Sequence, residues 1–147
     1  MRLLWLLVAF CAAFCGIAAE ARGRDTKFYQ DNIASLYKSS EATAHIEITG
    51  FTLIKVIRGM DTATGKAIGP IGYRTYRIKF RLVETYKGRI KSSSPFTMSI
   101  EYPGKPPLGE FIASFESDGK GSYYLADDSQ FMVPARPELV TFARSLK

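Results

Sequence analysis

His45 is the only histidine in this chain of 147 residues, and histidine is the side chain best suited to acid–base chemistry near neutral pH. Glu47 follows two positions later, on the same face if this segment is a strand, so the pair could exchange a proton or hold a metal ion weakly. A hydrolase would also need a nucleophile, and no nucleophile elbow is present. We expect an outward-facing pair without a catalytic role, and keep a hydrolase that uses His45 and Glu47 as an alternative.

Two other stretches bear only a passing likeness to ligand sites. The segment from Gly59 to Ala67 looks like a phosphate-binding P-loop, but five residues separate its glycines and Ala67 stands where a magnesium-binding hydroxyl belongs. Asp127 and Asp128 lack the ligand spacing of a calcium loop and favour a turn at a strand end. We therefore expect neither a metal nor a cofactor.

The best candidate for binding is a row of basic residues, Arg77, Lys79 and Arg81, which we call the basic row. In a strand these alternate residues lie on one face, about 6.5–7 Å apart, an interval suited to successive charges of a polyanion. Tyr73 extends that face with a ring that could stack on a ligand. The alternative is an ordinary solvated strand face that discourages edge pairing. Other basic residues are expected near its ends: Arg74, Lys87, Arg89 and Lys91.

The net charge of +6 is concentrated in this part of the chain. Residues 55–91 contain ten basic and two acidic residues, whereas the segments on either side are close to neutral. A local excess of this size predicts a basic face and an acidic partner.

Alternation of apolar and polar residues predicts the strands that would carry these side chains. Gly50 interrupts the first strand and indicates a bulge. The glycines and the proline within residues 59–72 indicate a long mobile hairpin loop, and Lys87-Gly88 indicates a turn. The predicted strands are 44–57, with its bulge, 75–82, 96–102, 111–115 and 123–126, and the predicted helices are 29–37 and 137–146.

These elements predict a mainly β fold, a five-stranded antiparallel OB-like barrel with short N-terminal and C-terminal helices. Residues 44–48, 76–88 and 96–102 resemble netrin-like domains related to tissue inhibitors of metalloproteinases, of which bacterial exported proteins carry cysteine-free versions. The resemblance covers most of residues 33–147 and implies the barrel. It does not imply protease inhibition, because the animal inhibitors act through an N-terminal cysteine.

Residues 1–21 have the features of a Sec-type signal peptide: a positive start, an apolar run and a small-x-small cleavage site ending at Ala21. Both cysteines, Cys11 and Cys15, lie inside it, so the mature chain would have none. An uncleaved anchor and a lipoprotein are the alternatives. We expect a single domain over 22–147, in the periplasm or secreted, because small secreted animal domains usually depend on disulfides.

The sequence therefore predicts an exported, non-enzymatic binding or interaction module that recognises an acidic partner through the basic row. We expect that partner to be another envelope protein or an acidic glycan or lipid headgroup, and not a nucleic acid. A small structural component of an envelope secretion or conjugation assembly is the second possibility. No transmembrane helix is expected after removal of the signal peptide.

Overall fold

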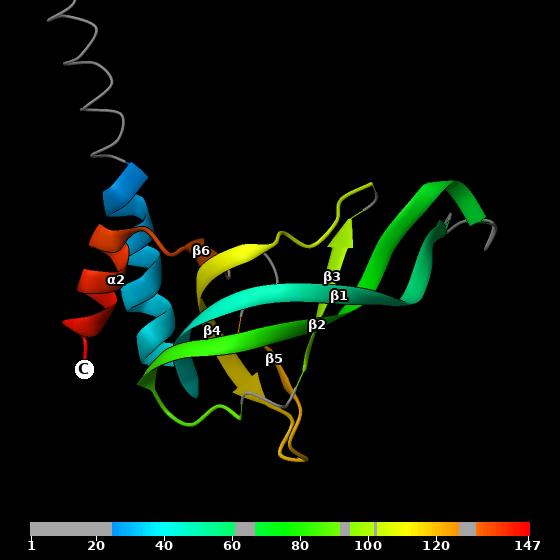
Figure 1. Ribbon diagram of the computed structural model, residues 1–147. Coiled ribbons are helices and arrows are strands. Elements are labelled where there is room, and N and C mark those ends of the chain that lie inside the picture. The colour runs from blue at the N-terminus through cyan, green and yellow to red at the C-terminus, as the bar shows by residue number, and fades with distance from the viewer. Residues whose placement is uncertain (1–24, 61–66, 92–94, 102, 127–131) are drawn as a thin grey trace, which may run out of the picture.

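The computed structural model describes residues 25–60, 67–91, 95–101, 103–126 and 132–147. Within these residues a helix over 25–39 precedes a six-stranded sheet and a C-terminal helix (Figure 1). The elements after the first helix are β1 (Ala42–Met60), β2 (Ala67–Lys87), β3 (Phe96–Glu101), β4 (Gly109–Ser117), β5 (Tyr123–Leu125), β6 (Met132–Pro134) and α2 (Pro137–Arg144).

Five of these strands close into a barrel in the order β1-β2-β3-β5-β4, because β4 returns to pair with residues 42–48 of β1. This confirms the predicted OB-like barrel. Neighbouring strands are antiparallel except β3 and β5, which pair in parallel through Phe96 with Tyr123 and Thr97 with Tyr124. Alternation within single strands cannot reveal this contact, so the barrel is mixed. The short β6, which the sequence did not predict, adds to β4 outside the closed ring.

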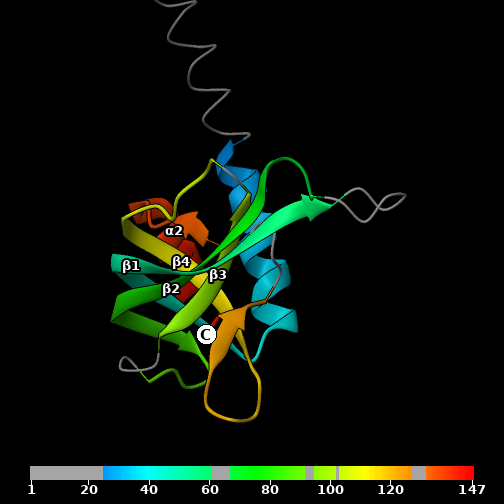
Figure 2. The ribbon, with the colours of Figure 1, turned by 90° about the vertical axis from the view of Figure 1, so that its right-hand side faces the viewer.

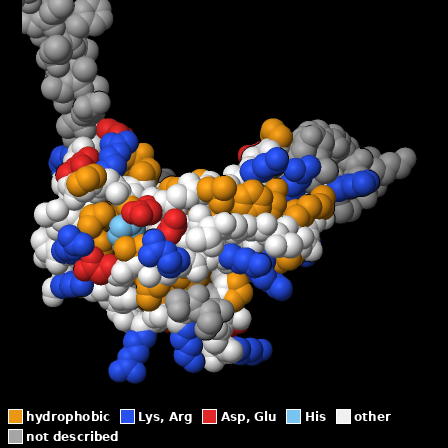
Figure 3. Space-filling view, in the orientation of Figure 1, with side chains coloured by type: hydrophobic (Ala, Val, Ile, Leu, Met, Phe, Trp, Pro, Cys, Tyr) orange, Lys and Arg blue, Asp and Glu red, His pale blue; other side chains and the backbone are white. Residues whose placement is uncertain are grey.

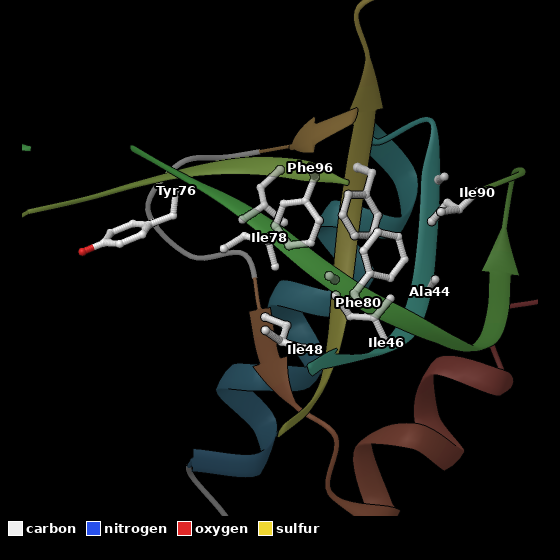
Figure 4. Close-up of a cluster of buried hydrophobic side chains, with 12 residues drawn as sticks. Ala44, Ile46, Ile48, Tyr76, Ile78, Phe80, Ile90 and Phe96 are labelled. Atoms are coloured by element: carbon white, nitrogen blue, oxygen red, sulfur yellow. The ribbon is translucent and has the colours of Figure 1, made fainter. Parts of the chain in front are cut away.

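The barrel interior contains the apolar side of the predicted alternation. Ile46 and Ile78 are fully buried on β1 and β2. Phe96 and Phe115 are also fully buried, with ring centroids 5.3 Å apart in a T-shaped contact, and Phe80 lies 5.6 Å from Phe96 (Figure 4). Edge-to-face aromatic pairs add stability beyond the apolar area that they bury.

A second apolar layer lies outside the barrel, where both helices pack against residues of β2, β4 and β6 (Figure 1). The predicted helical faces are confirmed, because Ile33 from the first helix and Leu139 and Ala143 from α2 are buried there against Ile112 of β4. Pro137 occupies the first turn of α2, as predicted, where its missing N–H costs no hydrogen bond.

The C-terminal end of β2 holds the first helix in place. Lys87 Nζ donates hydrogen bonds to three backbone carbonyls at the helix end: Tyr37 O at 2.7 Å, Ser40 O at 2.6 Å and Lys38 O at 3.2 Å. Gly88 follows with φ +67°, and a Cβ there would lie 2.3 Å from Glu41 O, so the predicted turn requires glycine.

Beyond the pairing with β4, β1 continues with β2 as a long hairpin arm, residues 52–60 and 67–77, and β3 pairs with β2 along residues 73–77 of this arm (Figures 1 and 2). The pairing shifts between Ile48 and Gly50, which confirms the predicted bulge. The predicted loop over residues 59–72 is wrong at both ends, because Met60 pairs with Ala67 and strand structure resumes there. The strand pairing continues through the glycines. A Cβ on Gly72 would lie only 3.2 Å from Gly59 N on the other strand, so glycine here lets the two backbones approach closely. Residues 61–66 lie outside the described part.

Candidate functional site

The basic row occupies the outer face of β2, as the alternation predicts. Arg77, Lys79 and Arg81 are exposed, whereas the intervening residues Ile78 and Phe80 are buried in the barrel. Tyr73 continues this face with a side chain that is 51% exposed. The four predicted binding residues therefore share one surface, and their role in binding remains a prediction.

Arg81 differs from the rest of the basic row because it already has an acidic partner. Its guanidinium contacts Glu47 Oε2 of β1 at 2.6 Å through Nη2 and 2.7 Å through Nε. Arg77 and Lys79 have no ion-pair partner among the described residues, so their charges are available to a ligand. The strongest anion-binding pair is thus Arg77 and Lys79, with Arg81 at one end and Tyr73 at the other.

Small neighbours leave this pair uncovered. Lys79 lies opposite Gly50 on β1, which has no side chain, and Arg77 lies opposite Thr52 on β1 and Thr97 on β3. A Cβ on Gly50 would meet no atom within 4 Å, so the surface is open at this point. A ligand could therefore approach both charged groups together.

Hydroxyl groups extend the surface across β3. Thr75 Oγ1 and Ser99 Oγ lie 3.0 Å apart in a hydrogen bond between the two strands. Thr97 and Ser99 are exposed, and Glu101 lies opposite Tyr73 at the end of the strand. The outer face of strands 2 and 3 is the surface that OB barrels use for oligonucleotides and oligosaccharides. Its basic and hydroxyl-rich character here suits a hydrogen-bonding anion.

The other basic residues named from the sequence have different positions. Lys87 is occupied with the end of the first helix, and Arg74 lies on the opposite face of β2 from the basic row. Arg89 and Lys91 follow Gly88 and are exposed, and Arg89 O accepts a hydrogen bond from a tyrosine of β5. Lys87 is therefore engaged by the fold, and Arg74 cannot act on the same surface as Arg77 and Lys79.

His45 is buried, only 7% exposed, which corrects the expectation of an outward-facing pair. It lies on the outer side of β1, but the helical layer covers that side. Its Nε2 lies 3.0 Å from Glu110 Oε2 of β4, and Glu47 binds Arg81 instead. The sequence missed Glu110 because the contact depends on the register of β1 with β4, where Glu47 and Glu110 are direct partners.

The histidine–carboxylate contact has no hydroxyl nucleophile bonded to it among the described residues. Three buried hydroxyls bond one another instead: Thr43 Oγ1 lies 3.0 Å from Ser114 Oγ and 3.2 Å from Ser40 Oγ. No group of three or more potential metal ligands occurs in the described part of the chain. Asp127 and Asp128 lie outside that part. The segment resembling a P-loop begins and ends in paired strands, so the helix that such a loop requires does not follow it.

Sequence reasoning also missed an exposed apolar surface on the arm. Four residues of β1 are between 42% and 46% exposed: Leu53, Ile54, Val56 and Ile57. In isolation their run favours a buried strand, and only the length of the hairpin beyond the barrel exposes them. Figure 3 shows hydrophobic and basic side chains next to one another along this part of the molecule.

Comparisons with protein-family models, with curated proteins and with solved structures find no significant match. The resemblance to netrin-like domains therefore stays a prediction, and the site is interpreted from its own geometry. None of the helices in the described part of the chain has the length and apolarity needed to cross a bilayer. Residues 1–24 lie outside that part, so the signal peptide also stays a prediction.

Proposed function

We propose that this protein is an exported, non-enzymatic binding module that holds an acidic partner on the outer face of β2. Arg77 and Lys79 carry the proposal, because they are adjacent exposed cations without an ion-pair partner among the described residues. Tyr73 and the hydroxyls of β3 complete a surface that can bind anions and stack on a planar group. The proposed partner is an envelope protein or an acidic glycan or lipid headgroup.

The test replaces Arg77 and Lys79 together with Gln and measures binding to heparin, a sulfated glycan, over a range of salt concentrations. We expect at least a fivefold loss of affinity and a weaker dependence on salt, because each lost contact releases fewer counterions. Lys38→Gln with Lys120→Gln removes the same charge from other exposed sites and should change affinity little. Equal losses in the two double variants would leave only a nonspecific effect of net charge.

Arg81→Gln separates the members of the row. Because Glu47 already neutralises Arg81, its removal should cost less affinity than removal of Arg77 or Lys79 alone. The same binding measurement with vesicles that contain phosphatidylglycerol tests a lipid headgroup as the ligand. Binding to vesicles but not to heparin would identify a lipid surface as the acidic partner.

The exposed apolar arm favours the second candidate, a component of a larger envelope assembly. Apolar groups exposed together commonly mark interaction surfaces. The hydrolase alternative has no observation in its favour among the described residues, because His45 is buried against Glu110 and no hydroxyl there bonds it.

A further inference from the structure

One edge of β1 becomes free beyond Ile48, where the pairing of β1 with β4 stops. β4 pairs with residues 42–48, whereas β1 continues to Met60 and, in the described part of the chain, pairs beyond Ile48 only with β2. Every residue from Thr52 to Arg58 is exposed. The backbone N–H and C=O groups along the outer edge are therefore available for pairing with another strand.

The two faces next to this edge differ in chemistry. Leu53 lies opposite Tyr76, which is buried in the barrel, so Leu53 belongs to the apolar face of the sheet. Val56, opposite Arg74, lies on the same face. Lys55 lies opposite Thr75 and so belongs to the other face, that of the basic row. A strand added here would meet Leu53 and Val56 on one face, where Arg74 also lies across β2, and Lys55 on the other face, where Ile57 lies opposite Tyr73.

Charge decides between the candidate occupants of the edge. The arm residues 52–60 and 67–77 include four basic residues and no acidic residue. A second copy of the chain would place two such arms side by side, and like charges on adjacent strands repel. A lipid bilayer could attract the charges but could not satisfy the free backbone groups of an open edge. An acidic peptide strand satisfies the charges, the apolar face and the backbone together.

We propose that β1 accepts a strand from a partner protein, along the edge from Thr52 to Arg58. The partner segment is extended, and acidic residues alternate in it with apolar ones. Its backbone pairs with β1, its apolar side chains contact Leu53 and Val56, and its carboxylates contact Lys55 and Arg58. Strand addition of this kind takes affinity from the main chain and specificity from alternate side chains. This inference rests on the proposed function because both treat the chain as a binding module. It assigns the partner strand to the edge of β1, whereas the proposed function uses the outer face of β2.

The first experiment measures the fluorescence anisotropy of labelled peptides of about ten residues, long enough to cover the edge. One peptide alternates Glu with Val and Thr, and its reference has the same composition with the Glu residues in one block. We expect the alternating peptide to bind at least about tenfold more tightly at low salt, because only alternation divides charge and apolar groups between two faces. Failure of the alternating peptide to bind would overturn the proposal.

N-methylation of the peptide tests the backbone pairing directly. Successive N–H groups of a strand point to opposite edges, so methylating alternate residues blocks one edge and leaves the other free. One of the two methylation patterns should abolish binding, and the other should preserve it. Tolerance of both patterns would show that the peptide binds without strand addition.

Variants of the protein locate the site. Lys55→Glu with Arg58→Glu should weaken peptide binding at least tenfold, whereas Lys38→Glu with Lys120→Glu, the matched change of charge elsewhere, should not. Circular dichroism confirms folding of each variant, since all four side chains are exposed. Equal weakening by both pairs would overturn the proposal.

The remaining outcomes separate this inference from its rivals and from the proposed function. Concentration-dependent dimerisation that needs Leu53 and Val56 would assign the edge to a second copy. Binding of phosphatidylglycerol vesicles, and not of the peptide, through Lys55 and Arg58 would assign it to a lipid surface. Unchanged heparin binding in the Arg77 and Lys79 variant, together with tight binding of the alternating peptide, would overturn the role of the basic row and keep strand addition. Loss of heparin binding in that variant, together with failure of the peptide to bind, would overturn strand addition and keep the basic row.

Discussion

Lys87→Met tests whether a lysine from the basic part of the sequence serves the fold rather than a ligand. The ammonium of Lys87 makes two short hydrogen bonds, at 2.6 and 2.7 Å, to carbonyls at the end of the first helix. Hydrogen bonds that involve a charged group contribute roughly 1.5–3 kcal/mol each. Water can replace part of this at a half-buried site, so we expect a loss of about 2 kcal/mol in the free energy of unfolding. Met retains most of the apolar stem.

The assay is urea unfolding followed by circular dichroism, with the thermal midpoint as a second measure. About 2 kcal/mol corresponds to a fall of roughly 4–8 °C in a domain of this size. Lys91→Met is the matched control, because Lys91 is exposed, and it should stay within about 0.5 kcal/mol of the parent. A loss from Lys87→Met no greater than that of the control would refute the capping role. A large loss of heparin affinity in a fully folded Lys87→Met protein would show that Lys87 takes part in ligand binding.

Two further changes test the contacts between β2 and the C-terminal helix. Burial, and then the nearby Glu84 carboxylate, raise the pKa of Tyr86 to about 12, and its hydroxyl lacks a hydrogen-bond partner among the described residues. Tyr86→Phe should therefore leave the free energy of unfolding equal or raise it by about 1 kcal/mol, and a clear loss in urea unfolding would reveal a missed partner. Hydrogen bonds from Lys147 and Arg144 lower the pKa of Glu84 below its ordinary 4.5. Above about pH 5 the free energy of unfolding of the parent should exceed that of Glu84→Gln, and this difference should disappear as the pH falls through the lowered pKa. A difference that persists at pH 2 would contradict the ion pairs.

The barrel could be predicted because each strand carries its own two-residue alternation. Ile78 and Phe80 alternate with the basic row within one segment, so no knowledge of neighbouring strands is needed to place them. The helical faces were predictable for the same reason, from a 3.6-residue period in a single segment. Local periodicity therefore defines which side of each element is buried.

The contacts that the sequence did not reveal all depend on pairing between distant segments. Glu47 looked like a partner for His45 because both lie on one strand, but cross-strand register brings Arg81 to Glu47 and Glu110 to His45. The glycines near residue 59 favour a turn in isolation, yet pairing across the arm keeps them in strands. The basic row was predictable as a face, whereas the neutralisation of Arg81 within it required the register.

The helical layer that joins the two ends of the chain has a consequence for folding kinetics. Ile33, near the beginning of the described chain, is buried in the same layer as Leu139 and Ala143, near its end. Contacts between segments so far apart form slowly, because a long loop must close before they are made. The β1–β2 hairpin can form early, but the helical layer stays incomplete until α2 docks. A chain released before Pro137 should therefore leave Ile112 without the cover of Leu139 and Ala143, and this partly open layer could associate with other unfolded chains.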